Sequence, residues 1–141
     1  MLEIKGNPKP QQRHRHFRLG TYDPSKKDKQ DFLVKAKQSH KIDIPLLTPL
    51  YMNIQFYMKR PKSHYRTGKF TGYIKEKWIK LPHTKKPDID NLIKFVLDAL
   101  QGQNGFFLDD SQVVRLYAEK IYTDDDPHTE IIILEENEKQ N

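Results

Sequence analysis

Residues 86–101 read KPDIDNLIKFVLDALQ, and the interpretation of the whole chain starts from this stretch. From Asp90 to Gln101 most positions are apolar and cover a broad side of a helix, while the polar positions share the remaining stripe. Gly102 follows and can end such a helix. We therefore predict a buried helix with one polar face. Asp88 is expected in extended backbone before it and Asp90 is expected as its cap, so that both carboxylates can point at one centre.

Four carboxylates stand around this predicted helix although the chain as a whole is basic. Asp88 and Asp90 stand at its start, and Asp109 and Asp110 follow the link after its end. Singly, each has an ordinary explanation, because an Asp before an apolar helix is an N-cap and an Asp pair after a loop forms a turn. Together they favour a shared site, since converging carboxylates repel unless they take up a proton or bind a cation. We expect the strand after Asp110 to return it to the helix start.

The expected ligand of this acidic site is a hard divalent cation. The chain contains no cysteine, which excludes disulfides, thiolate zinc sites, iron–sulfur clusters and a cysteine nucleophile. Carboxylate oxygens suit Mg²⁺, with Mn²⁺ as a substitute. Lys94 lies one turn beyond Asp90. It either forms an ion pair with that aspartate or contacts a scissile phosphate and offsets transition-state charge, and the spacing leaves both roles open.

Outside this region the pattern predicts a small domain of mixed α/β or α+β class. The 141 residues, 35% of them hydrophobic, suit one modest core that a second copy of the chain could extend. A helix is expected from Asp23, as N-cap with Pro24 at the first position, to Ser39. Strands are expected at 1–4, 51–58, 113–122 and 129–135, with a loop at 11–18, a hairpin turn at 123–127 and a disordered tail at 136–141.

The charge distribution points to a polyanionic partner. Lys and Arg number 25 against 19 Asp and Glu, for a net charge of +6. Residues 59–86 hold ten basic side chains against the single acid Glu76, with aromatic residues between them. This basic loop is either a solvated, poorly ordered segment or a nucleic-acid surface whose rings stack on unpaired bases. No stretch is suited to span a membrane or to act as a secretory signal, so we expect a cytoplasmic protein.

Several runs of sequence together resemble the RusA family of Holliday-junction resolvases. They are KPDIDNL at 86–92, Lys94, LDAL at 97–100 and GFFLDDSQVV at 105–114, and the match continues at Lys120. The segment PKPQ at 8–11, with Arg13, Arg15 and YDP at 22–24, resembles the family's opening more loosely. His14 stands where relatives often have proline, and the basic loop is long, so contacts with DNA are less well defined than the acidic centre.

The resemblance implies a RusA-like domain over 1–135 with a mixed sheet packed by helices. It implies a homodimeric, Mg²⁺-dependent endodeoxyribonuclease that resolves four-way DNA junctions by paired symmetric nicks in recombination and repair, of a kind often carried by phages and prophages. The family's catalytic and metal-binding carboxylates carry over onto Asp88, Asp90 and Asp110, and its functional lysine onto Lys94. Asn91 and Asp109 receive supporting roles, with Asp109 the less favoured metal ligand. No small-molecule cofactor is expected.

Two other functions remain open at this point. For the resolvase, the residues expected to contact DNA are Arg13, Arg15, Lys69, Lys85 and Lys86. A non-catalytic protein that binds structured or single-stranded nucleic acid could use the same basic surface, with the aspartates only capping helices and fixing turns. A metal nuclease acting on flaps or single strands would share the acidic centre but rank its substrates differently.

Overall fold

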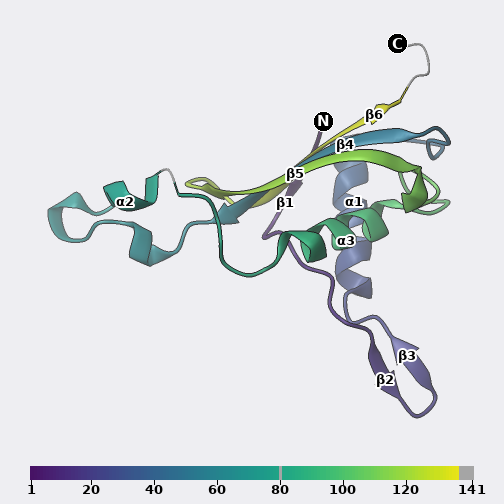
Figure 1. The fold of residues 1–141 in the computed structure, drawn as a ribbon, viewed down its shortest axis with the longest axis horizontal. Helices are drawn as coiled ribbons and strands as arrows, with labels where there is room; N and C mark the ends of the chain where they lie inside the picture. Colours follow the sequence, from purple (N-terminus) through teal and green to yellow (C-terminus); the bar gives the residue numbers. More distant parts are fainter. Residues whose placement is uncertain (80, 137–141) are drawn as a thin grey trace.

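A four-stranded mixed sheet with helices on one face forms the body of the molecule (Figure 1). The computed structural model describes residues 1–79 and 81–136. The sheet contains β1 (Leu2–Lys5), β4 (Leu50–Lys59), β5 (Val113–Thr123) and β6 (His128–Glu135), in the order β1-β6-β4-β5. β4 pairs parallel with β5 and antiparallel with β6. The predicted class and mixed sheet are therefore confirmed for a small single α+β domain.

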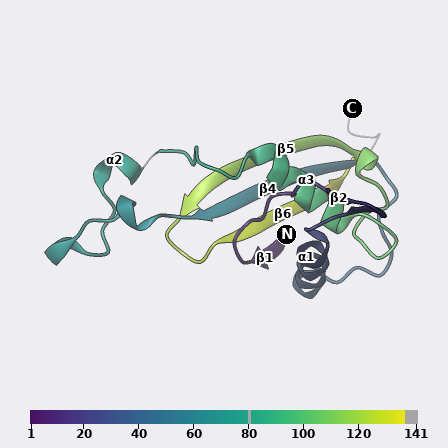
Figure 2. The same ribbon diagram turned by 90° about the horizontal axis from the view of Figure 1, so that it is seen from below.

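The core lies between this sheet and two helices, α1 (Lys26–Ser39) and α3 (Ile89–Leu100) (Figures 1 and 2). Alternate residues of β4, from Leu50 to Met58, are buried beneath the helices, as the alternation in sequence predicts. Phe32 of α1 meets Phe95 of α3 edge to face, with ring centroids 5.6 Å apart. None of the helices in the described residues combines the length and apolar character needed to span a bilayer.

The connection at 123–127 joins two strands that do not pair with each other. The expected hairpin is wrong, because β4 lies between β5 and β6 in the sheet. Arg60, just after β4, forms an ion pair with Asp124 in this connection, with Nε and Oδ1 2.9 Å apart. The turn therefore carries the chain from β5 past the end of β4 to β6.

The N-terminal region contains two departures from the sequence prediction. Residues 11–18 are not a simple loop, because β2 (Arg15–Phe17) and β3 (Gly20–Tyr22) form an antiparallel hairpin. Helix α1 begins at Lys26, two residues later than predicted, with Ser25 at its N-cap. The Asp23 carboxylate instead accepts a hydrogen bond from the Ser25 N–H at 2.9 Å, so Asp23 fixes the turn before the helix.

The basic loop projects from one end of the sheet and has local structure (Figures 1 and 2). It contains 3₁₀ turns at Lys62–His64 and Gly68–Phe70 and one helical turn, α2 (Glu76–Ile79). At its base the rings of His64 and Trp78 stack with centroids 4.0 Å apart.

The tail predicted at 136–141 does not begin at residue 136. The Glu136 N–H donates to the Pro49 carbonyl at 2.8 Å, which ties this residue beside the sheet. Residues 137–141 lie outside the part of the chain that the structure describes.

Candidate active site

Two of the predicted carboxylates lie together at the start of α3. Asp88 has extended backbone, with φ −70° and ψ 145°, as predicted. The helix begins at Ile89, so Asp88 takes the N-cap position and Asp90 lies in the first turn. The predicted cap at Asp90 is therefore wrong, and the Asp88 side chain makes no capping hydrogen bond. Both side chains are exposed, which leaves their oxygens open to a ligand from solvent.

A lysine on the sheet holds the main chain that leads to Asp88. The Lys120 ammonium on β5 donates to the carbonyl oxygens of Lys85 and Pro87, at 2.8 and 2.9 Å. These hydrogen bonds fasten both ends of a short segment whose next residue is Asp88. Lys120 therefore positions the acidic site from the sheet side. Sequence reasoning noted this lysine only as part of the family resemblance.

Basic and polar groups surround the two carboxylates. Lys86 forms an ion pair with Asp88 at 3.1 Å, but both side chains are more than half exposed and such a pair contributes little to stability. The Asn91 N–H donates to Asp90 Oδ1 at 2.9 Å. Lys94 is exposed on the next turn, and the ion pairs among the described residues do not include one between Lys94 and Asp90.

Asp110 lies in a braced turn beyond the other end of α3. Its N–H donates to Gln101 Oε1 at 3.0 Å. Gln112 Oε1 accepts from the N–H groups of Leu108 and Asp109, both at 2.9 Å. Asp109 is the N-cap of the 3₁₀ turn Asp110–Gln112, and hydrogen bonds from Ser111 lower the pKa of the Asp109 carboxyl. The Asp109 carboxylate is thus bonded within the turn, whereas Asp110 is exposed to solvent.

The three principal carboxylates do not converge within one chain. Helix α3 has 12 residues, about 18 Å at its usual rise, and it separates Asp88 and Asp90 from Asp110. β5 does return beside the helix, but it begins just after Asp110 and reaches the Asp88 end only at Lys120. Among the described residues no three acidic, His or Cys groups are spaced to hold a metal ion. The expected convergence within one chain is therefore wrong.

The residues predicted to contact DNA fall into three places. Lys85 and Lys86 lie just before the acidic pair and are separated from Asp88 by Pro87. Arg13 and Arg15 lie at the β2–β3 hairpin, whose base is tied to α3 by a hydrogen bond from the Gln11 N–H to the Asn91 carbonyl at 2.9 Å. Lys69 lies farther out, on the projecting basic loop. All of these basic side chains are exposed.

Comparison with known proteins identifies the family. The sequence profile described as endodeoxyribonuclease RusA matches residues 5–134. The chain belongs to the RusA endodeoxyribonuclease family. It is also 34% identical over 124 residues to the uncharacterized protein YqaN of Bacillus subtilis (strain 168), covering 86% of this chain and 82% of that protein.

RusA-family nucleases are generally metal-dependent, and the donors at the start of α3 suit a hard divalent ion. Asp88 and Asp90 supply only carboxylate oxygens, and both are exposed. The number of donors is small, because one chain brings two carboxylates of the motif together and leaves Asp110 at the far end of α3.

Proposed function

We propose that this protein is a Mg²⁺-dependent endonuclease that resolves four-way DNA junctions in recombination and repair. One observation carries the proposal. The paired family carboxylates, Asp88 and Asp90, are exposed at a helix start that lysines flank on both sides. Bare carboxylates would repel a phosphodiester, whereas the lysines would attract it. A cation bound to the carboxylates would remove this repulsion, because it offsets their negative charge. The family profile over residues 5–134 supports the nuclease chemistry.

The chain's own groups divide the work in this proposal. Asp88 and Asp90 hold the ion, for which Mn²⁺ can substitute. When bound, such an ion polarises the phosphodiester and lowers the pKa of a water molecule. Lys94, one turn along the same face, offsets negative charge that develops on the phosphate. Lys120 keeps the segment before Asp88 in place, and Lys85 and Lys86 contact the DNA backbone.

The proposal includes a homodimer, in which Asp110 of one copy completes the acidic site of the other. Its support is α3, which is about 18 Å long and has the acidic pair at its start, whereas Asp110 is hydrogen-bonded to Gln101 at its far end. A twofold axis that passes beside the middle of α3 would set the start of this helix in one copy next to its end in the other. Each dimer would then hold two equivalent sites, which suits paired nicks in a junction whose strands are related by symmetry.

The outer edge of β5 is the surface we propose for this pairing. β5 is an edge strand of the sheet in the described residues. Val114 and Leu116 near its start are 57% and 37% exposed. Antiparallel pairing of β5 with its copy would cover these side chains and satisfy the open edge. The start of β5 in one copy, which follows Asp110, would then lie beside Lys120 in the other copy, which holds the segment before Asp88.

The test compares Asp90→Asn with the parent protein on a four-way junction in Mg²⁺. The variant should bind the junction at least as tightly, because a negative charge near the phosphates is removed, while nicking falls to background. Asp43→Asn is the matched control, since Asp43 is exposed and outside the motif, and it should cut like the parent. Cutting by Asp90→Asn at the parent's rate would refute the catalytic role and favour a non-catalytic binding protein.

The substrate is tested by comparing a junction, a flap, a duplex and a single strand of the same sequence. We expect junctions to be cut fastest, with two symmetric nicks. Faster cutting of flaps or single strands would retain the metal nuclease but refute junction resolution.

A further inference from the structure

The β2–β3 hairpin projects away from the sheet and the helices (Figure 1). All the residues of its two strands are exposed. Its register pairs Arg15 with Tyr22 and Phe17 with Gly20, so Arg15, Phe17 and Tyr22 share one face. His16 pairs with Thr21 on the opposite face. The hairpin therefore has one aromatic and cationic face and one small polar face.

Apolar side chains on the aromatic face and at the tip of the hairpin are exposed to solvent. Phe17 and Tyr22 are 54% and 48% exposed, and their ring centroids lie 6.1 Å apart. Leu19, in the turn at the tip, is 90% exposed. Exposed apolar groups this close together on so short an element are unfavourable in water and mark a binding surface.

The charge around these rings selects the kind of partner. Residues 13–18 read RHRHFR, and no acidic residue occurs between Gln12 and Tyr22. Arginines can meet phosphates while the rings meet exposed bases, which is the combination used by proteins that bind unpaired strands. An apolar protein partner would have to accept the same arginines without counter-charges. The partner that fits is DNA with accessible base faces.

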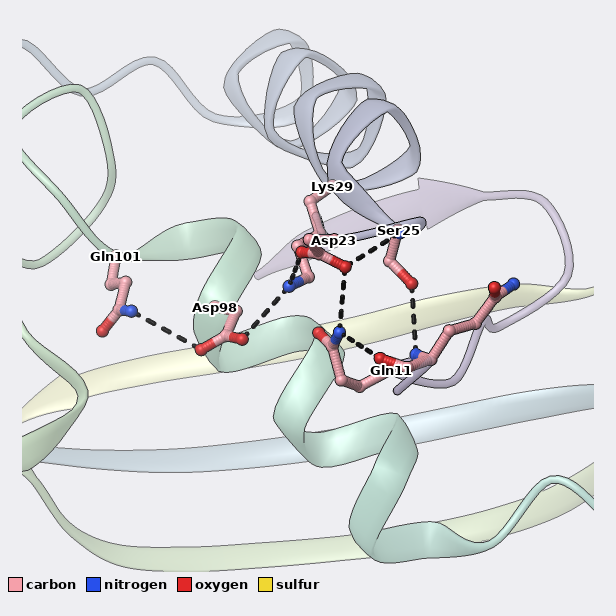
Figure 3. A network of polar contacts seen from close by, with 7 residues as sticks. Gln11, Asp23, Ser25, Lys29, Asp98 and Gln101 are labelled. Carbon is pink, nitrogen blue, oxygen red and sulfur yellow. Dashed lines mark hydrogen bonds and ion pairs between the residues drawn. The ribbon is translucent and has the colours of Figure 1, made fainter. Parts of the chain in front are cut away.

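The base of the hairpin is fastened to the helix that carries the acidic pair (Figure 3). On one side, Gln11 donates its N–H to the Asn91 carbonyl of α3 and its amide to Asp23 Oδ1, at 2.9 and 3.1 Å. On the other side, Lys29 bridges Asp23 and Asp98 of α3, at 2.7 and 3.1 Å.

The charge of Asp23 helps to maintain this anchor. Burial opposes ionisation of Asp23, but hydrogen bonds from Lys29, the Ser25 N–H and Gln11 outweigh it and lower the pKa of the carboxyl. These contacts hold the base of the hairpin against α3, the helix that carries Asp90 in its first turn.

We propose that this hairpin is a wedge that enters the branch point of junction DNA with its tip, Leu19, first. Phe17 and Tyr22 then stack on bases at the branch point. The inference rests on the proposed function and extends it, because it names the feature of the substrate that is read. Parting stacked bases is costly in a continuous duplex and least costly where stacking is already interrupted. The wedge would therefore favour branched DNA and set the scissile phosphate relative to Asp88 and Asp90.

The test uses a four-way junction with 2-aminopurine at the branch point, because the fluorescence of this base is quenched by stacking on neighbouring bases and rises when a wedge separates it from them. Binding is measured without Mg²⁺, so that nothing is cut. The parent protein should raise the fluorescence of the junction but not that of a duplex carrying the same base. A Phe17→Ala, Tyr22→Ala double variant should lose most of the rise and bind the junction at least about thirtyfold more weakly. A His16→Ala, Thr21→Ala double variant, altered on the opposite face, is the matched control and should behave like the parent.

Different outcomes separate this proposal from the proposed function. If the parent cuts junctions in Mg²⁺ but never raises the fluorescence, the wedge is refuted and the nuclease stands. If the fluorescence rises but no cutting occurs, the wedge stands and the nuclease fails. A fall in the dimer fraction of the aromatic variant would show that the face joins two copies and would refute the wedge. Should that variant misfold, Leu19→Ser at the exposed tip provides the same measurement, and full retention of the rise would count against the proposal.

Discussion

Mixing two inactive variants gives a direct measure of whether the acidic site is shared between copies. Asp88→Asn and Asp110→Asn should each abolish nicking alone, because every site of either homodimer lacks one carboxylate. In a mixed dimer of the proposed arrangement, one site receives both substitutions and the other receives neither. Random pairing of equal amounts gives about half mixed dimers, so about one quarter of all sites are intact. We therefore expect nicking to return to about a quarter of the parent's rate.

The assay follows single-strand nicks in a labelled junction after the two variants have been unfolded and refolded together, with native mass spectrometry to count mixed dimers. Resolution by paired cuts should stay low, because no mixed dimer has two intact sites. Mixing Asp88→Asn with Asp90→Asn is the control. Both substitutions lie at the same helix start, so each site of that mixed dimer lacks one carboxylate and nicking should not return.

The expectation depends on the two ends of α3, about 18 Å apart, holding the acidic pair and the Asp110 turn separately within one chain. If all three carboxylates served a site within one chain, no mixed dimer would contain an intact site. Absence of recovered nicking in a sample that contains mixed dimers would therefore refute the shared site. A purely monomeric parent protein that still cuts would refute it as well.

Three further predictions concern the surroundings of the site. Burial, and after it a nearby arginine, lowers the pKa of His64 from its ordinary value of 6.5. The stability that the neutral His64 ring gives to the fold is therefore complete above pH 6.5 and is lost as the pH falls below that value. The fluorescence of Trp78, the chain's single tryptophan, should change over this acidic range, and an unchanged signal would contradict the stacking of the two rings. Lys120→Met should slow nicking about ten- to a hundredfold by releasing the segment before Asp88, with junction binding unchanged, and an unaltered nicking rate would count against its positioning role. Phe107→Ala, at a fully buried core position, should lower the free energy of unfolding in urea by about 3–5 kcal/mol, and a loss below about 1 kcal/mol would show that the core adapts.

The sequence predicted the elements of the core well, because their apolar patterns are strong. α3 was placed to within one residue, and the alternation of β4 marked its buried side. The order of the strands in the sheet was harder to predict from the sequence. Strand patterns in 113–122 and 129–135 suggest a hairpin, since neighbouring strands often pair, but nothing in either pattern indicates that β4 lies between them. The β2–β3 hairpin was missed because its short, exposed strands carry no buried alternation.

In the acidic site, too, the features set by neighbouring residues were predicted and those set by tertiary contacts were not. The short spacing of Asp88 and Asp90 was enough to place them together. The sequence offered a turn only as the ordinary explanation of the Asp109–Asp110 pair, and the structure contains that turn with Asp109 as its cap. The position of Asp110 depends on the direction of β5 along α3, a property of tertiary pairing. The role of Lys120 and the hydrogen bond from Gln112 to the Leu46 carbonyl also arise from contacts between segments remote in sequence. Such contacts leave no local signature.

The place of β6 in the sheet has a consequence for the biosynthesis of this protein. β6 (His128–Glu135) lies between β1 and β4, so the strand nearest the beginning of the chain finds its partner only after residue 131 has been made. A nascent chain that has already emerged through α3 still lacks the strand that joins its first and fourth strands. Completion of the four-stranded sheet is therefore postponed until translation has passed β6, and premature termination before it yields a protein that lacks the strand between β1 and β4.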